Sequence, residues 1–196
     1  GVGPGYIHDT QCVMYDGPDS DYTGAEICFS ASEEGFTITD VTEKNDLRTI
    51  RLEETGMNSY AHQGWLTEDK QFYLMNDELD EFNSSLPTRT FIFNVSDLDN
   101  PQFVGTHTFP LLSVDHNLYV KDNLVFESNY TSGLRVLDIS GVASANLTET
   151  AYFDTFPLHN GPGFLGTWSN YPYFESEHII VSDIQAGLFI LRLNQE

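Results

Sequence analysis

The chain has 196 residues, with 30 Asp and Glu against 8 Lys and Arg, which gives a formal net charge of −22 at pH 7. Nucleic acid and anionic membrane surfaces are therefore unsuitable partners, because phosphate is bound by clustered cations. The length is enough for one domain with a substantial core, and no stretch is long and apolar enough to span a bilayer.

One pattern recurs four times along the chain. Its anchors are His8, His62, His116 and Trp168, and consecutive anchors lie 54, 54 and 52 residues apart. Each anchor is followed by short apolar runs, the first at 11–14, 65–66, 118–120 and 171–174. Second runs occupy 26–29, 71–75, 123–126 and 178–181, and third runs occupy 36–41, 91–95, 134–139 and 188–193. Three units have a fourth run, at 47–52, 102–109 and 150–156.

These runs are typical of β-strands, because they are short, rich in β-branched and aromatic residues and bounded by turn residues. No run of ten or more residues has a convincing helical period. A β-sandwich also has many short strands, but four strands per unit at a period near fifty favour propeller blades. We therefore expect an all-β fold, a β-propeller with four-stranded antiparallel blades at residues 7–56, 57–111 and 112–162 and a partial blade at 163–196.

A propeller with three and a half blades is incomplete, since propellers close with about four to eight blades. An open arc would expose sheet edges and blade faces. We therefore expect a section of a larger propeller, whose missing blades or partner cover the ends.

The two cysteines, Cys12 and Cys28, fall in the first and second strands of the first unit. Adjacent antiparallel strands would bring them within disulfide reach if their register agrees. A disulfide would indicate an oxidising compartment, and the alternative is two free buried thiols.

Four Asn-x-Ser/Thr triplets are candidate glycosylation sites, as in a secreted glycoprotein, at Asn83, Asn94, Asn129 and Asn146. The chain begins at Gly1 and shows no signal peptide, which indicates a processed or trimmed polypeptide. We expect an extracellular or cell-surface location. A prokaryotic exported protein would carry the same triplets without glycan.

Several motifs resemble those of the LVIVD-repeat proteins, which include the bacterial choice-of-anchor B group. They are His8–Cys12, Gly17-Pro18-Asp19, Glu26–Phe29, His62–Asp69, Asn76–Glu81, Asp115–Val120, Ser128-Asn129-Tyr130, Gly133–Asp138 and Trp168–Pro172. The resemblance covers nearly the whole chain and implies an exported or surface-attached β-propeller, without a reaction to carry over. Relatives are longer, with an N-terminal part and a variable anchor that this chain lacks.

The anchor histidines are the first candidate site. Propeller first strands line the central channel, which would place His8, His62 and His116 at one end with Asp115 beside them. Three converging imidazoles could bind a transition metal or order a polar ligand. The alternative is a structural belt in which each histidine binds backbone groups of the neighbouring blade. His178 is out of register.

Two acidic loops are candidate calcium sites, because Ca²⁺ takes six to eight oxygen ligands. One loop contains Asp16, Asp19 and Asp21, and the other contains Asp77, Glu78, Asp80 and Glu81. Neither matches the EF-hand pattern, and the alternative is that both are solvated turns.

No complete catalytic set is evident. The chain has no Gly-x-Ser-x-Gly elbow and no glycine-rich phosphate loop before a helix. The paired carboxylates of a glycoside hydrolase remain open, because that pairing is spatial. We expect a propeller module for protein or ligand recognition and extracellular assembly, whose partner is another extracellular protein or the missing blades. The alternative is a metal-binding protein or metal-dependent enzyme that uses the histidines, and stabilisation by calcium is compatible with the first hypothesis.

Overall fold

The computed structural model describes residues 6–56 and 60–194. In this part of the chain, fifteen strands form four antiparallel sheets, each built from strands that are consecutive in the sequence. The first sheet contains β1 (Asp9–Met14), β2 (Glu26–Ser32), β3 (Gly35–Asp40) and β4 (Arg48–Glu54). The second contains β5 (Ala61–Leu66), β6 (Phe72–Asp77), β7 (Arg89–Asn94) and β8 (Gln102–Thr108). The third contains β9 (Asn117–Lys121), β10 (Leu124–Ser128), β11 (Leu134–Asp138) and β12 (Thr148–Phe153). The fourth contains β13 (Thr167–Tyr171), β14 (Ile179–Asp183) and β15 (Gly187–Leu191).

Helix is limited to short pieces among the described residues. They are the 3₁₀ turns η1 (Ser20–Tyr22) and η2 (Val142–Ser144) and the α-helix α1 (Asp80–Ser84). The all-β prediction is therefore confirmed.

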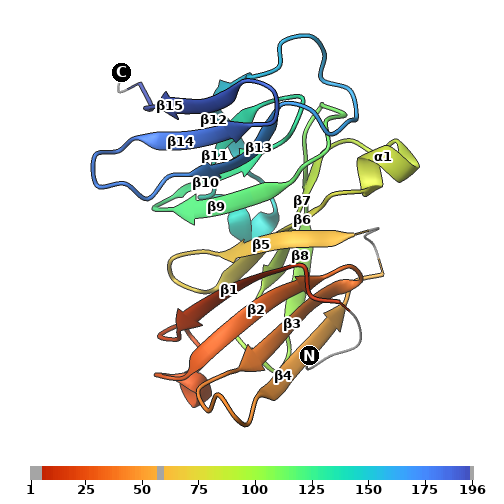
Figure 1. Cartoon of the computed structure of the whole chain (residues 1–196). Helices are drawn as coiled ribbons and strands as arrows, with labels where there is room; N and C mark the ends of the chain where they lie inside the picture. Colours follow the sequence, from red (N-terminus) through yellow and green to blue (C-terminus); the bar gives the residue numbers. More distant parts are fainter. Residues whose placement is uncertain (1–5, 57–59, 195–196) are drawn as a thin grey trace.

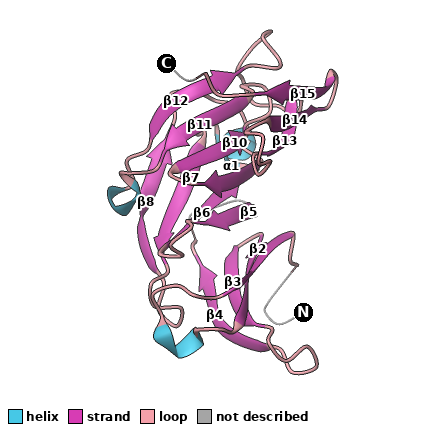
Figure 2. Ribbon diagram, turned by 90° about the vertical axis from the view of Figure 1, so that its left-hand side faces the viewer, coloured by secondary structure: helices cyan, strands magenta, loops and turns pink. Residues whose placement is uncertain are grey.

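The four sheets follow one another in chain order, from the first sheet at one end of the molecule to the fourth at the other (Figure 1). Their first strands adjoin, since β1 contacts β5, β5 contacts β9, and β9 contacts β13. Figure 2 shows the same succession from the side. Equivalent residues at the starts of neighbouring sheets therefore lie close to one another.

Three apolar layers hold the sheets together, one at each junction. Phe29 and Phe36 of the first sheet pack with Phe93 of the second. The second layer joins the second and third sheets and includes Leu74 and Val125. The third joins the third and fourth sheets. Burial of these side chains contributes on the order of 25 cal/mol per Å² of apolar surface removed from water, so the junctions stabilise the arrangement of the sheets.

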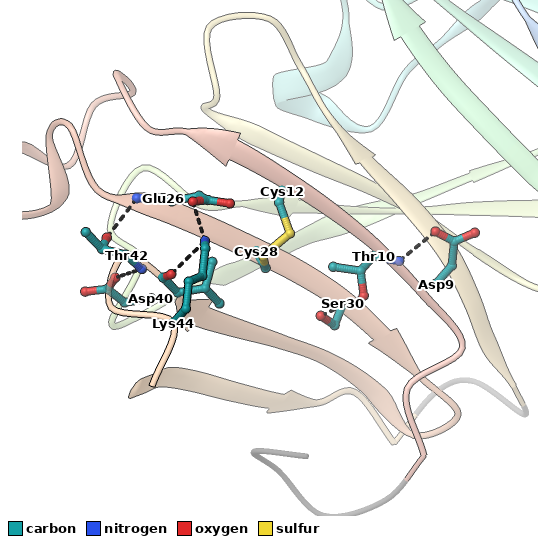
Figure 3. Close-up of a disulfide and its surroundings, with 10 residues drawn as sticks. Asp9, Thr10, Cys12, Glu26, Cys28, Ser30, Asp40, Thr42 and Lys44 are labelled. Carbon is teal, nitrogen blue, oxygen red and sulfur yellow. Dashed lines mark hydrogen bonds and ion pairs between the residues drawn. A yellow bond between two sulfur atoms is a disulfide. The ribbon is translucent and has the colours of Figure 1, made fainter. Parts of the chain in front are cut away.

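The disulfide prediction is confirmed, because Cys12 and Cys28 are bonded to each other. They face each other in the register of β1 and β2 (Figure 3). Directly opposite residues on antiparallel strands share a face of the sheet. On the same face, the Thr10 hydroxyl donates to the Ser30 hydroxyl at 3.0 Å.

The predictions fail for the first strand of the fourth unit and for the acidic loop at 77–81. The first strand of the fourth unit was expected at 171–174, but β13 ends at Tyr171. Pro172 follows and cannot donate a ladder hydrogen bond. The acidic segment 77–81 was expected to be a loop, but β6 extends through Asp77 and α1 begins at Asp80. No helix in the described residues is long and apolar enough to cross a membrane.

Candidate functional site: a histidine row beside buried carboxylates

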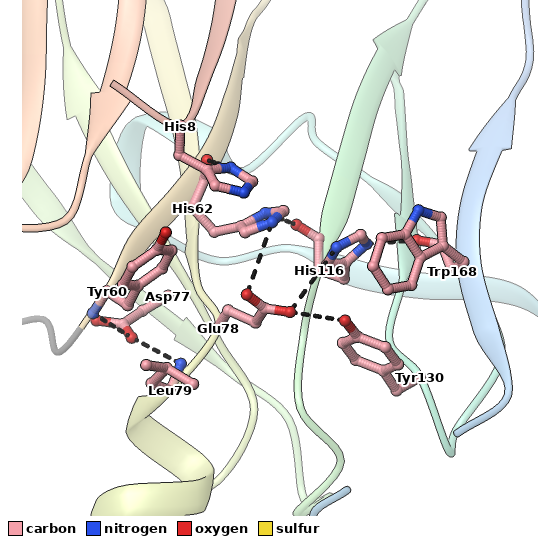
Figure 4. Close-up of polar contacts among 9 residues, drawn as sticks. All are labelled: His8, Tyr60, His62, Asp77, Glu78, Leu79, His116, Tyr130 and Trp168. Carbon is pink, nitrogen blue, oxygen red and sulfur yellow. Dashed lines mark hydrogen bonds and ion pairs between the residues drawn. The ribbon is translucent and has the colours of Figure 1, made fainter. Parts of the chain in front are cut away.

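Three histidines form a row across the starts of the sheets (Figure 4). The Nδ1 atom of His8 lies 3.1 Å from the carbonyl oxygen of His62. The Nδ1 atom of His62 lies 2.9 Å from the carbonyl oxygen of His116, and Nδ1 of His116 contacts the carbonyl oxygen of Trp168. A carbonyl oxygen only accepts, so each of these Nδ1 atoms carries a proton. Each imidazole therefore donates to the backbone of the next sheet.

The rings of the row lie side by side, tilted by 41° and 38° to one another, rather than converging on one point. The His8 and His62 centroids lie 4.0 Å apart, and those of His62 and His116 lie 4.3 Å apart. His8 is exposed at the open end, whereas His62 and His116 are buried. The Nδ1 atoms thus behave as the structural-belt alternative describes, since each binds a backbone carbonyl of the neighbouring sheet.

Glu78 faces the other ring nitrogens of the two buried histidines. Its Oε2 lies 3.7 Å from Nε2 of His62, and its Oε1 lies 3.8 Å from Nε2 of His116. The Tyr130 hydroxyl donates to Glu78 Oε1 at 2.6 Å, which fixes the carboxylate in this position. One ligand atom from each of His62, Glu78 and His116 lies within 4.8 Å of the other two.

Burial keeps the two inner imidazoles neutral. Desolvation, reinforced by the neighbouring His8, lowers the pKa of His62 to about 4. Desolvation and the neighbouring His62 likewise lower the pKa of His116 to about 4. Both are neutral at pH 7, so their approach to Glu78 is not an ion pair.

A cluster of buried carboxylates comes from the end of β6, from α1 and from the segment just before β9. Asp77, Asp80, Glu81 and Asp115 are each no more than 2% exposed. Asp80 is paired with Arg89, which donates from Nε at 2.8 Å. Both oxygens of Glu81 and both oxygens of Asp115 lack a hydrogen-bond partner among the described residues.

The charges of this cluster shift its proton affinities upward. Burial, followed by the adjacent Asp80, raises the pKa of Glu81 to about 10. Burial, followed by the charge of Glu81, raises the pKa of Asp115 well above its ordinary value. Glu81 is therefore protonated at pH 7, because an ionised carboxylate is costly to bury beside like charges.

The structure divides the expected histidine site. His62 and His116 share Glu78, while His8 lies outside that group of three. Asp115 belongs with Glu81 and Asp80 rather than with the ring nitrogens. The convergence of three imidazoles is thus replaced by two imidazoles and one carboxylate, because His8 comes from the outermost sheet of the row.

The second expected calcium loop, residues 77–81, does not form one oxygen cage. Asp77 accepts from the backbone N–H groups of Tyr60 and Leu79, at 2.9 and 3.1 Å. Glu78 faces the histidines, and Asp80 binds Arg89. The three carboxylates therefore have different partners.

The first expected calcium loop is likewise divided. Asp16 pairs with Lys70, and the backbone N–H of Asp21 donates to Asp19. The other oxygen of Asp19 accepts from the backbone N–H of Leu98, and a ligand oxygen of Asp19 lies near those of Asp97 and Asp99. Sequence reasoning missed these last two acids, which come from the turn after β7.

The four candidate glycosylation sites differ in exposure. Asn83 and Asn146 are exposed, and Asn94 is half-buried at the end of β7. Asn129 is fully buried, and its amide nitrogen donates to Glu127 at 3.3 Å. Asn129 is therefore not a surface acceptor in this fold, because a glycan would need the space that these side chains fill.

Comparisons with known proteins show a similarity of fold but no matching family. No family model matches the chain, and no curated protein matches it. A functionally unknown protein from Desulfotomaculum acetoxidans is similar in structure, with a TM-score of 0.64 and 16% identity over 98% of this chain and 53% of that one. A protein from Lactobacillus plantarum has a TM-score of 0.60 and 13% identity over 85% of this chain and 53% of that one. The dihydro-heme d1 dehydrogenase NirN has a TM-score of 0.59 and 14% identity over 95% of this chain and 35% of that one. The chain thus spans about half or less of the length of these three structures, and the likeness is one of fold alone.

Proposed function

We propose that this chain is a section of a secreted or cell-surface β-propeller that serves recognition and extracellular assembly. In this proposal the four sheets are blades, and further four-stranded sheets of the same kind continue the arc. The proposal depends most on one observation, the uncovered apolar face of the fourth sheet.

That face contains a row of apolar side chains across three strands. Tyr171, Ile180 and Ile190 are directly opposite one another in the register, so they share the face. Tyr171 is 47% exposed and Ile190 is 65% exposed, and Leu188 on the same strand as Ile190 is 60% exposed. The other side of β15 packs on the third sheet through Phe189 and Leu191. An exposed apolar sheet face of this kind marks an interaction surface.

A further sheet is the occupant that fits this face. Each of the three junctions between neighbouring sheets is an apolar layer. The exposed apolar face of the fourth sheet is therefore the kind of surface that another sheet of this fold would cover. The greater length of the three similar structures supports the same reading. The disulfide supports an oxidising, extracellular compartment.

Hydroxyl-radical footprinting of the protein in its native secreted form tests the proposal. Tyr171, Leu188 and Ile190 are expected to be protected, while Leu158, a loop residue that is 80% exposed, is labelled and serves as the internal control. Labelling of the fourth-sheet face at the rate of Leu158 would refute coverage by another sheet. The double substitution L188D/I190D is expected to disrupt assembly of the native protein, and L158D is expected to leave it intact.

A further inference from the structure

We propose that His62, Glu78 and His116 bind a divalent transition-metal ion of the zinc class. The inference goes beyond the recognition and assembly function, because a propeller section could serve that function without a metal. It is carried by the backbone hydrogen bonds of the two imidazoles and by the position of Glu78 opposite their Nε2 atoms.

The hydrogen bonds of the row fix which nitrogen of each ring is free. Nδ1 of His62 and Nδ1 of His116 each donate to a backbone carbonyl, so in the neutral ring the lone pair is on Nε2. Metal-binding histidines usually donate their other ring N–H to a carbonyl or a carboxylate in this way, which orients the ring and sets its tautomer. The backbone of the neighbouring sheets thus prepares both Nε2 atoms as ligands.

The two Nε2 atoms face the Glu78 carboxylate, and a cation placed between the nitrogens and the carboxylate would stabilise this arrangement. Two lone pairs approach the oxygens of Glu78 at 3.7 and 3.8 Å, and both distances are too long for hydrogen bonds. A lone pair and a carboxylate oxygen repel each other, whereas both are attracted to a metal ion. Ligands at the Zn–N and Zn–O distances of a tetrahedral site are roughly 3.3 to 3.5 Å apart. The two nitrogen-to-oxygen distances exceed this spacing by only a few tenths of an ångström, and one ligand atom from each of the three residues lies within 4.8 Å of the other two.

The ligand set favours zinc over calcium and magnesium. Imidazole nitrogen suits zinc and its neighbours among the transition metals, while the hard cations prefer oxygen ligands. Two histidines and one glutamate are also a known catalytic zinc set, which leaves the fourth position for water or a substrate group. Glu78 is 16% exposed at its side chain, so the site can be reached from solvent.

Tyr130 acts on the site through Glu78. Its hydroxyl donates to Glu78 Oε1 at 2.6 Å and holds the carboxylate toward the two rings. Outer partners of this kind are worth about 10- to 100-fold in metal affinity. Tyr130 is thus a positioning residue, and its replacement by Phe should weaken binding without removing a ligand.

Zinc titration of the purified metal-free chain, followed by competition with a chromogenic chelator, tests the proposal. Wild-type protein is expected to bind one equivalent of zinc tightly. E78Q is expected to bind at least about 100-fold more weakly, because it loses a charged ligand while keeping the shape of the side chain and an acceptor for Tyr130. H116A should lose binding to a similar extent, and Y130F should lose about 10- to 100-fold.

His8→Ala and His178→Ala are the matched controls. His8 belongs to the row but not to the group of three, and His178 is a half-buried residue outside both. The His8→Ala and His178→Ala variants should both bind zinc as tightly as the wild type. The proposal is overturned if the wild type does not bind one equivalent, or if E78Q binds as tightly as the wild type. Thermal melts of each variant check that it is folded, and E78Q decides the matter if H116A does not fold.

Discussion

Glu127 is a buried acid whose removal should change how stability depends on pH. Its side chain is fully buried on β10. The Thr90 hydroxyl donates to one oxygen at 2.8 Å, and the amide of Asn129 donates to the other at 3.3 Å. Arg135, the cross-strand neighbour of Glu127, donates instead to Glu149 and to the Ser132 carbonyl. Burial therefore dominates and raises the pKa of Glu127 from 4.5 to about 7.

The sign and size of the effect follow from this shift. A carboxyl whose pKa is raised in the folded state binds its proton more tightly there than in the unfolded chain. Its contribution to stability is fully present below pH 4.5 and is lost as the pH rises through 7. A shift of this size corresponds to about 3 kcal/mol, at roughly 1.4 kcal/mol for each pKa unit.

Glu127→Gln should remove this loss, because Gln has nearly the same shape and no charge. We expect the free energy of unfolding of E127Q to match that of the wild type near pH 4 and to exceed it by about 3 kcal/mol at pH 8. Urea denaturation at each pH, followed by Trp fluorescence, measures the difference. The exposed Glu175→Gln is the control, and it should differ from the wild type by less than about 0.5 kcal/mol at every pH. A stability difference between E127Q and the wild type that does not change with pH would refute the reasoning.

Two further substitutions test the packing and the cross-link. Replacing Cys12 and Cys28 by Ser, which opens a link between residues 16 positions apart, should lower the free energy of unfolding by about 3 kcal/mol. Reduction of the wild type with dithiothreitol should reproduce that loss in a urea titration, and a change below about 0.5 kcal/mol would contradict it. Gly64→Ala should cost about 1 to 3 kcal/mol by overpacking, because the new Cβ would lie 2.6 Å from the Leu74 carbonyl oxygen and would also overlap the Tyr73 ring. Gly161→Ala is the control, because its Cβ would have its nearest neighbour at 3.7 Å. Equal melting temperatures for the two variants would show that β5 can accommodate the extra methyl group at Gly64, against the prediction.

The repeating sheets could be predicted from the sequence, because the strand runs are short, rich in β-branched and aromatic residues and bounded by turn residues. The pairing of Cys12 with Cys28 could be predicted for the same reason, since both lie on neighbouring strands of one sheet. The first strand of the fourth unit was misplaced because the run 171–174 is apolar throughout. Tyr173 in fact leaves the sheet after Pro172 and donates its hydroxyl to the Val120 carbonyl of the third sheet at 2.8 Å.

The histidine spacing predicted that the three rings are neighbours but not how they face. The equal spacing places His8, His62 and His116 at equivalent points of successive sheets, and equivalent points form a row. Whether such a row converges depends on hydrogen bonds to the backbone, which no residue pattern reveals. The role of Glu78 was hidden because an acidic run usually faces water.

The acidic run at 77–81 was the most misleading feature of the sequence. Acids between two strands were interpreted as a solvated or calcium-binding turn, yet Asp77, Asp80 and Glu81 are almost completely buried. The continuation of β6 and the short α1 direct them inward. The one sequence signal that could have indicated this is Arg89, which lies nine residues beyond Asp80 and pairs with it.

The histidine row is tested most directly by the protonation of its rings. Long-range ¹H–¹⁵N correlation of the imidazoles in ¹⁵N-labelled protein at pH 7, recorded without and with one equivalent of zinc, reports this for each ring. The account predicts that His62 and His116 carry their proton on Nδ1, and that zinc moves their Nε2 resonances while leaving His178 unchanged. A proton on Nε2 of either ring would contradict the account, because Nδ1 could then not donate to the next sheet and Nε2 could not bind the metal.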